Sequence, residues 1–175
     1  DLGGSAAIHR MLPDFPLHAS TQMSVHNTDA SLILAAEGFS RAVLARELSR
    51  DNIRSFTANS PLEAEIFVHG ALCMSYSGQC LFSSIVGGRS GNRGECAQPC
   101  RLHYGTPDGK HYPLSLKDMC LAEHIPELMN SGISSFKIEG RMKSAYYTAV
   151  TANAYRMAMD RYLADPAGYQ FDGRL

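Results

Sequence analysis

The sequence predicts an α/β protein: part of a parallel (β/α)8 TIM-type barrel, with about five βα units and a cysteine-rich loop inserted among them. Short apolar runs alternate with longer segments of helical period, and glycine or proline follows most of the helical segments. A chain of 175 residues, 45% of them hydrophobic, can bury one core. Repeated strand-then-helix order implies parallel strands joined by right-handed crossovers.

Each expected strand is a short apolar run bounded by turn residues, at residues 17–25, 41–45, 62–69, 112–116 and 134–139, of which 112–116 is the weakest. The expected helices carry the longer period and occupy residues 28–37, 51–57, 121–130 and 144–163. Asn27 or Thr28 provides the first N-cap, Gly38 and Gly132 stop two of the helices, and Pro166 follows the last.

Five units are too few to close an eight-unit barrel, so we interpret residues 1–175 as the later, C-terminal portion of one. An open parallel sheet leaves its edges unpaired, and we therefore expect this portion to self-associate through them. The net charge of -1, from 16 basic and 17 acidic residues, gives no support for a polybasic nucleic-acid coat. No apolar run is long enough for a membrane helix and the first residues are not basic, so we expect a soluble, cytoplasmic protein.

Four of the five cysteines, Cys73, Cys80, Cys96 and Cys100, lie close together in the chain, whereas Cys120 stands apart. Such clustering favours metal or redox chemistry over structural disulfides, and free buried thiols would have no reason to cluster. Four thiolates suit a tetrahedral zinc ion or a 4Fe-4S cluster. Only the second pair has the tight spacing of a zinc knuckle, which favours the cluster, with zinc as the alternative. The glycine-rich loop between the pairs can bring N–H groups near cluster sulfurs.

Three long motifs carry a family resemblance: EIFVHGALCMSYSGQC at 65–80, NRGECAQPCR at 92–101 and SFKIEGRMK at 135–143. With them the chain closely resembles the collagenase-like peptidase family, peptidase family U32, over nearly its whole length. The resemblance implies a barrel whose first three βα units and C-terminal extension lie outside this chain. It also implies a 4Fe-4S cluster, because in ubiquinone-biosynthesis members four matching cysteines hold one.

The same resemblance implies a reaction. Better-understood members resemble oxygen-independent hydroxylation factors that act on a tRNA wobble uridine or an rRNA cytidine, with prephenate implicated as the hydroxyl source; others act in ubiquinone synthesis. We therefore expect the complete protein to hydroxylate an RNA base, and this partial barrel alone to be inactive. Peptidase activity is the alternative that the family name implies, and a hydroxylation factor of ubiquinone biosynthesis is another alternative. The chain contains no Gly-x-Ser-x-Gly elbow and no His-Glu-x-x-His motif, so nothing in the sequence selects a nucleophile or an activated water.

Candidate site residues follow from their positions near the carboxyl ends of the expected strands, where parallel barrels place their sites. Strand alternation puts Lys137 and Glu139 on one face and Phe136 and Ile138 on the other, and it likewise puts Glu65, Phe67 and His69 on one face of the strand at 62–69. The candidate catalytic residues are Glu47, His69, Lys137 and Glu139. The candidates for binding a dicarboxylate such as prephenate, or RNA, are Gln22, Arg46, Arg89, Arg93, Arg101 and Arg141, since arginine forms a planar clamp for carboxylates.

Each of these side chains has a structural alternative. Arg46 or Arg141 could cap a helix or pair with a neighbouring glutamate, and His69 could be a packed histidine of the core. Lys137 and Glu139 could form an internal ion pair. A third class of function, a zinc-stabilised RNA-binding module, would make the cysteines structural and use Arg89, Arg93 and Arg101 for phosphate contacts.

Overall fold

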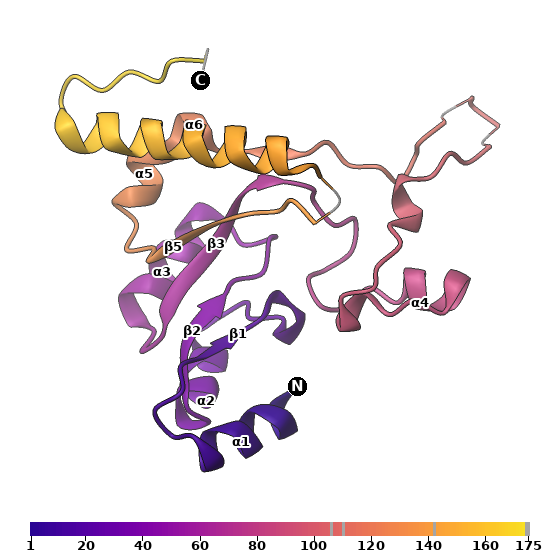
Figure 1. The fold of residues 1–175 in the computed structure, drawn as a ribbon, viewed down its shortest axis with the longest axis horizontal. Helices are drawn as coiled ribbons and strands as arrows, with labels where there is room; N and C mark the ends of the chain where they lie inside the picture. Colours follow the sequence, from indigo (N-terminus) through magenta and orange to yellow (C-terminus); the bar gives the residue numbers. More distant parts are fainter. Residues whose placement is uncertain (106, 110, 142, 174–175) are drawn as a thin grey trace.

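The computed structural model describes residues 1–105, 107–109, 111–141 and 143–173, and its centre is a five-stranded, mostly parallel sheet (Figure 1). The strands are β1 (Leu17–Ala19), β2 (Phe39–Val43), β3 (Glu63–Gly70), β4 (Met119–Cys120) and β5 (Ser135–Ile138). The helices are α1 (Leu2–Met11), α2 (Thr28–Ala36), α3 (Arg50–Asn59), α4 (Phe82–Gly87), α5 (Ile125–Met129) and α6 (Ala145–Ala164). Short 3-10 turns are η1 (Thr21–Met23), η2 (Gly91–Arg93), η3 (Pro99–Arg101) and η4 (Ala122–His124).

The sheet has the order β1-β2-β3 with β5 also on β3, and these four strands are parallel. The fifth strand, β4, is different: it runs antiparallel to the end of β3, where His69 faces Cys120. The α/β class and the parallel order are therefore confirmed, but the prediction of five parallel strands was wrong. The sheet is open among the described residues, so the barrel remains a prediction.

The expected strand at 112–116 does not form, and β4 occurs a few residues later. Pro113 lacks the N–H that a strand ladder needs. The guanidinium of Arg101 also donates hydrogen bonds to the Ser115 hydroxyl and to the Leu116 carbonyl. These bonds hold the segment as a loop.

The helices α2, α3, α5 and α6 bury one face of the sheet. Their contributions to a single core include Leu34, Phe56, Ile125, Tyr155 and Ala158, which pack with inward-facing side chains of the strands. On β3 and β5 the expected alternation is confirmed, because Ile66, Val68, Phe136 and Ile138 belong to this core. The opposite face of the same strands carries Glu65, Phe67 and Lys137, with Lys137 Nζ 2.9 Å from Glu65 Oε1.

Helix boundaries follow local capping. Asn27 accepts a hydrogen bond from the Ala30 amide and begins α2, and Ser144 does the same for Tyr147 at the start of α6. The expected strand at 17–25 is cut short after Ala19, because Ser20 caps the turn η1. Two helices were not expected: α1, whose sequence includes two glycines, and α4, which is only six residues long.

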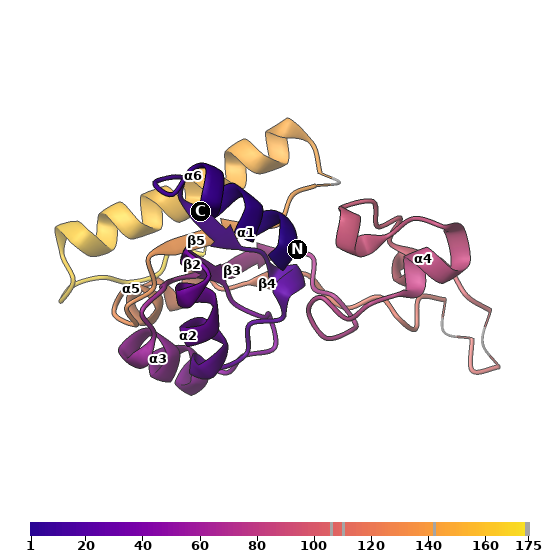
Figure 2. The ribbon, with the colours of Figure 1, turned by 90° about the horizontal axis from the view of Figure 1, so that it is seen from below.

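The segment that carries α4 and the four clustered cysteines projects away from the sheet and its helices (Figures 1 and 2). It leaves the sheet at the carboxyl end of β3 and returns at β4. In the described part of the chain, no helix is both long and apolar enough to span a bilayer.

Candidate functional site

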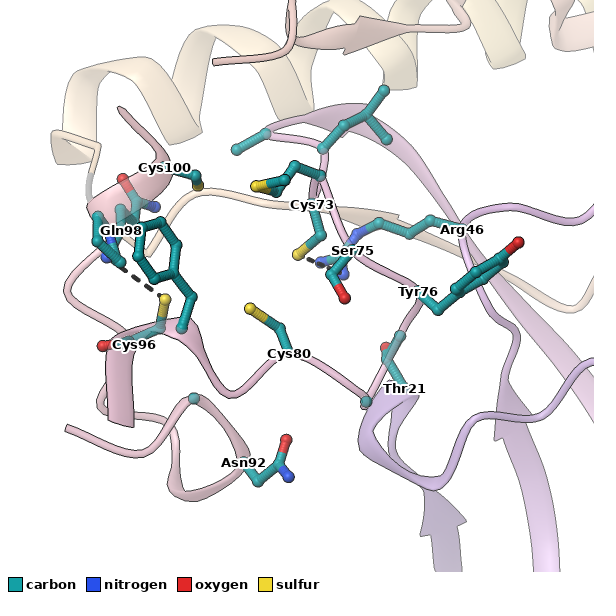
Figure 3. A pocket seen from close by; sticks show the side chains of 18 of the residues that line it. Thr21, Arg46, Cys73, Ser75, Tyr76, Cys80, Asn92, Cys96, Gln98 and Cys100 are labelled. Atoms are coloured by element: carbon teal, nitrogen blue, oxygen red, sulfur yellow. Dashed lines mark hydrogen bonds between the residues drawn. The ribbon is translucent and has the colours of Figure 1, made fainter. Parts of the chain in front are cut away.

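A pocket lies at the carboxyl end of β3, and all four clustered cysteines line it (Figure 3). Cys73 follows β3 closely, Cys80 precedes α4, Cys96 lies between two 3-10 turns, and Cys100 is within η3. The site therefore lies where a parallel α/β sheet presents its functional groups. Cys73 and Cys100, which are 27 positions apart in the chain, line the same pocket because the intervening segment folds back on itself.

The start of this segment is fixed by a close backbone approach. Gly70 ends β3 with a φ of +103°, and a Cβ atom placed on it would collide with the carbonyl oxygen of Glu139. The neighbouring strand end is held by a hydrogen bond from the Glu139 amide to the His69 carbonyl at 2.8 Å. Only glycine allows β3 and the residues after β5 to approach this closely. As a result Cys73 and Glu139 share the pocket.

The far side of the segment is tied together by Ser83 and Gln98. The Ser83 hydroxyl of α4 accepts a hydrogen bond from the Ala97 amide at 3.0 Å, which joins α4 to the second cysteine pair. Gln98 adopts a left-handed φ of 56°, and its amide donates to Cys96 Sγ at 3.4 Å. A backbone N–H directed at a cysteine sulfur is the arrangement found at metal–thiolate centres.

The four thiols have the chemistry of a soft-metal site. All five cysteines are free, so no disulfide competes for the four sulfurs. Burial raises the pKa of Cys73 and of Cys100, while Arg46 and Arg101 respectively oppose that rise. Negative charge on Cys80 and Cys96 raises the pKa of Cys73 further, because these sulfurs act on one another across the pocket. Deprotonating the four thiols together would bring like charges close to one another, and a bound cation relieves that repulsion.

The donor set fits a cluster or a zinc ion, but the side chains do not yet have ligand spacing. Within the described residues, no three His, Cys, Asp or Glu side chains are grouped tightly enough to hold a metal ion. Figure 3 shows the four sulfurs placed around a common space rather than directed to separate surfaces. Binding a single metal ion therefore requires the sulfurs to move closer together.

Arg46 is the central charged residue of the pocket. Its guanidinium stacks on Phe67, with Cζ 3.8 Å from the ring centroid. One terminal nitrogen donates to Glu139 Oε2 at 3.0 Å and the other lies 3.6 Å from Cys73 Sγ. The pairing alternative for Arg46 is thus confirmed, and the same guanidinium also places a positive charge against a candidate ligand sulfur.

The other candidate binding residues divide into two groups. Gln22, Arg101 and Arg141 line the pocket, and Arg101 and Arg141 extend with Lys143 into a second pocket that adjoins it. Arg89 donates instead to the Glu95 carbonyl at 2.9 Å, and Arg93 lies on the exposed turn η2. Neither Arg89 nor Arg93 is among the residues that line the two pockets.

Of the four candidate catalytic residues, only Glu139 lines the pocket. Lys137 pairs with Glu65 and Glu139 pairs with Arg46, so the alternative of an internal ion pair between Lys137 and Glu139 was wrong. His69 packs against Tyr155 with ring centroids 5.6 Å apart, and burial lowers its pKa, which matches the alternative of a packed histidine.

Glu47 holds the cysteine loop instead of facing the pocket. Its two carboxylate oxygens accept from the amide and hydroxyl of Ser77 at 2.7 and 2.8 Å, and His26 Nε2 lies 3.0 Å from it. Burial pushes the pKa of Glu47 upward, but the hydrogen bonds from Ser77 and His26 outweigh burial and leave that pKa below its ordinary value. Sequence reasoning missed Ser77 and His26; their distance from Glu47 in the chain left no local signal.

The chain matches one protein-family model and several proteins of known name. The model of peptidase family U32 matches residues 1–173. The tRNA hydroxylation protein P1 of Bacillus subtilis is 40% identical over 173 residues, which are 91% of this chain and 41% of that protein. The Escherichia coli synthase of 5-hydroxycytidine in 23S rRNA is 40% identical over 162 residues, 88% of this chain and 25% of that protein.

A relative with a different name is the collagenase of Porphyromonas gingivalis, 34% identical over 166 residues, 83% of this chain and 40% of that protein. The chain thus spans less than half the length of these relatives. No solved structure gave a significant match.

Proposed function

The chain belongs to peptidase family U32, and we propose that the complete protein hydroxylates a base of tRNA or rRNA without molecular oxygen, at a 4Fe-4S cluster held by Cys73, Cys80, Cys96 and Cys100. The names of two relatives, a tRNA hydroxylation protein and an rRNA hydroxycytidine synthase, support the reaction class. When bound, such a cluster supplies electron-transfer or Lewis-acid chemistry.

One observation carries this proposal: the four cysteines line a single pocket together with Arg46, Arg101 and Arg141. A structural zinc module would not need cationic side chains within its thiol pocket, because the zinc is enclosed by its own ligands. A redox centre that acts on a substrate needs both the metal and groups that bind the substrate beside it. The pocket places four thiols, the candidate metal ligands, beside three guanidinium groups.

Arg141 is the best candidate for binding an anionic co-substrate such as prephenate. Its guanidinium donates to the Gly94 carbonyl at 3.0 Å, and among the described residues no carboxylate lies within ion-pair distance of it. In contrast, Arg46 is paired with Glu139 and Arg101 with Asp118. A guanidinium that retains free N–H groups in the pocket can accept a carboxylate in two-point contact.

The collagenase relative makes peptidase activity the second candidate. A serine or cysteine peptidase needs a nucleophile within hydrogen-bond reach of its base. In the described part of the chain, no hydrogen bond joins a serine or cysteine side chain to a histidine ring. Ser77 and His26 both contact Glu47, but Ser77 is 2% exposed and donates its hydroxyl proton to the carboxylate, so it is not poised to attack a peptide.

Complementation tests the proposal. Cells that lack the gene should regain one nucleoside carrying an extra oxygen atom in digested tRNA or rRNA when they receive the complete protein, under anaerobic growth, as measured by mass spectrometry. The variant Cys96→Ser should not restore it, whereas Cys120→Ser should. No change in any RNA nucleoside, together with cleavage of gelatin by metal-free protein, would instead establish the peptidase.

A further inference from the structure

Glu47 lies under the loop that joins Cys73 to Cys80, and it reaches that loop through Ser77. We propose that Glu47, braced by His26, is a positioning residue that holds this loop so that both thiols face the pocket. The proposal rests on the cluster site proposed above and adds to it the three residues Glu47, His26 and Ser77, which we call the loop clamp.

Ser77 is the point where the clamp holds the loop. It is 2% exposed, its amide donates to Glu47 Oε1 at 2.7 Å and its hydroxyl donates to Glu47 Oε2 at 2.8 Å. The same hydroxyl accepts a hydrogen bond from the Arg46 amide at 3.1 Å. A carboxylate that accepts two hydrogen bonds from one residue fixes both the position and the orientation of that residue. Ser77 lies four positions after one thiol and three before the other, so fixing it restricts both.

His26 supports the carboxylate from the other side. Its Nε2 lies 3.0 Å from Glu47 Oε1 and its Nδ1 lies 2.6 Å from the Ser24 carbonyl oxygen. Both ring nitrogens therefore face acceptors, which the doubly protonated ring satisfies at once. Ser24 completes the contact, because its hydroxyl donates to the Ser77 carbonyl at 2.6 Å and accepts from Gln79 Nε2 at 3.0 Å.

Gly78 shows how closely the loop is held. Its φ is +76°, and a Cβ atom placed on it would lie 2.6 Å from both the Gln22 carbonyl oxygen and Ser24 Oγ. The loop therefore packs directly on the segment around η1, with no space for a side chain. Two adjacent residues thus act on one loop: Arg46 contacts the Cys73 sulfur, and Glu47 fixes the backbone between the two thiols.

Amide hydrogen exchange of the cluster-free protein tests the clamp directly. Glu47→Gln keeps the shape of the side chain but removes its charge and one acceptor, and exchange in residues 74–79 should accelerate about tenfold or more. Alkylation of Cys73 and Cys80 by iodoacetamide, followed residue by residue, should rise severalfold relative to Cys120. The matched control is Glu37→Gln, at the exposed C-cap position that follows α2, and it should change neither rate.

Unchanged exchange in residues 74–79 of the Glu47→Gln variant would overturn the proposal. Equal acceleration at Cys120 and in the core strands would overturn it too, because the residue would then act only on global stability. If Glu47→Gln does not fold, Ser77→Ala removes the hydroxyl bond to Glu47, together with the acceptor of the Arg46 amide, and must give the same regional pattern.

Iron loading separates this proposal from the proposed function. After anaerobic reconstitution, the Glu47→Gln variant should lose iron to a chelator several times faster than the unaltered protein, and Glu37→Gln should not. If the unaltered protein binds no iron, the proposed function fails, and the exchange rates alone still decide whether the clamp holds the loop. If it binds iron and Glu47→Gln loses it at the same rate, the positioning role fails while the cluster stands.

Discussion

Replacing Arg46 with Gln should lower the free energy of unfolding by about 2–3 kcal/mol. The guanidinium makes a charge-assisted hydrogen bond to Glu139 at 3.0 Å, with side chains that are only 13% and 22% exposed, and such a bond contributes roughly 1.5–3 kcal/mol. Its stacking on Phe67 at 3.8 Å adds roughly 1 kcal/mol. The two contributions overlap, so the expected loss is smaller than the sum of their upper limits.

A double-mutant cycle isolates the ion pair. Urea unfolding followed by circular dichroism should be measured for Arg46→Gln, Glu139→Gln and the double variant, with a constant denaturant slope as the check on two-state behaviour. The coupling energy should be about 1–3 kcal/mol. If the double variant loses as much stability as the two single variants added together, the two side chains do not interact and our description of the pocket's charged centre is wrong.

Three further predictions concern the core, the pocket entrance and pH. Phe56→Ala removes a side chain that is 1% exposed and should cost about 3–5 kcal/mol in urea unfolding; a loss below about 1 kcal/mol would contradict its place in the core. Gly70→Ala should lower the free energy of unfolding by at least about 2 kcal/mol, because it strains a left-handed backbone and displaces the Glu139 carbonyl. An unchanged free energy of unfolding would refute the close approach of Gly70 to Glu139. The hydrogen bond to Glu47 raises the pKa of His26 above its ordinary 6.5, and the pKa of Glu47 lies below its ordinary 4.5. The pair therefore stabilises the fold most between about pH 4.5 and 6.5, and this stabilisation is lost as pH rises through the His26 pKa or falls through that of Glu47. The difference in melting temperature between the unaltered protein and His26→Gln should be largest in that window. A difference that does not change with pH would contradict the prediction.

The sheet could be predicted where each strand's own side chains determine its faces. On β3 the alternation of Ile66 and Val68 with Glu65 and Phe67 reflects a strand with one face against helices, and the structure confirms it. The starts of α2 and α6 could also be predicted from nearby residues, because one hydrogen bond to an Asn or Ser side chain begins each helix. The antiparallel β4 could not be predicted, because a two-residue strand has no period to detect.

The candidate site divides in the same way. The clustering of the cysteines in the sequence was sufficient to predict that they share a pocket, because a short segment keeps them near one another. The role of Glu47 could not be predicted, since it depends on His26 and Ser77, which only the folded chain brings together. Its position near a strand end predicted that His69 belongs to the site. In the structure its ring packs against Tyr155 instead.

The measurement that tests the cluster most directly is the iron and acid-labile sulfide content of the complete protein after anaerobic reconstitution. We expect about four irons and four sulfides per chain, unchanged in Cys120→Ser and lost in Cys96→Ser. Full loading of the Cys96→Ser variant, or stoichiometric zinc without sulfide in the unaltered protein under the same conditions, would contradict the assignment of these four thiols to an iron-sulfur cluster.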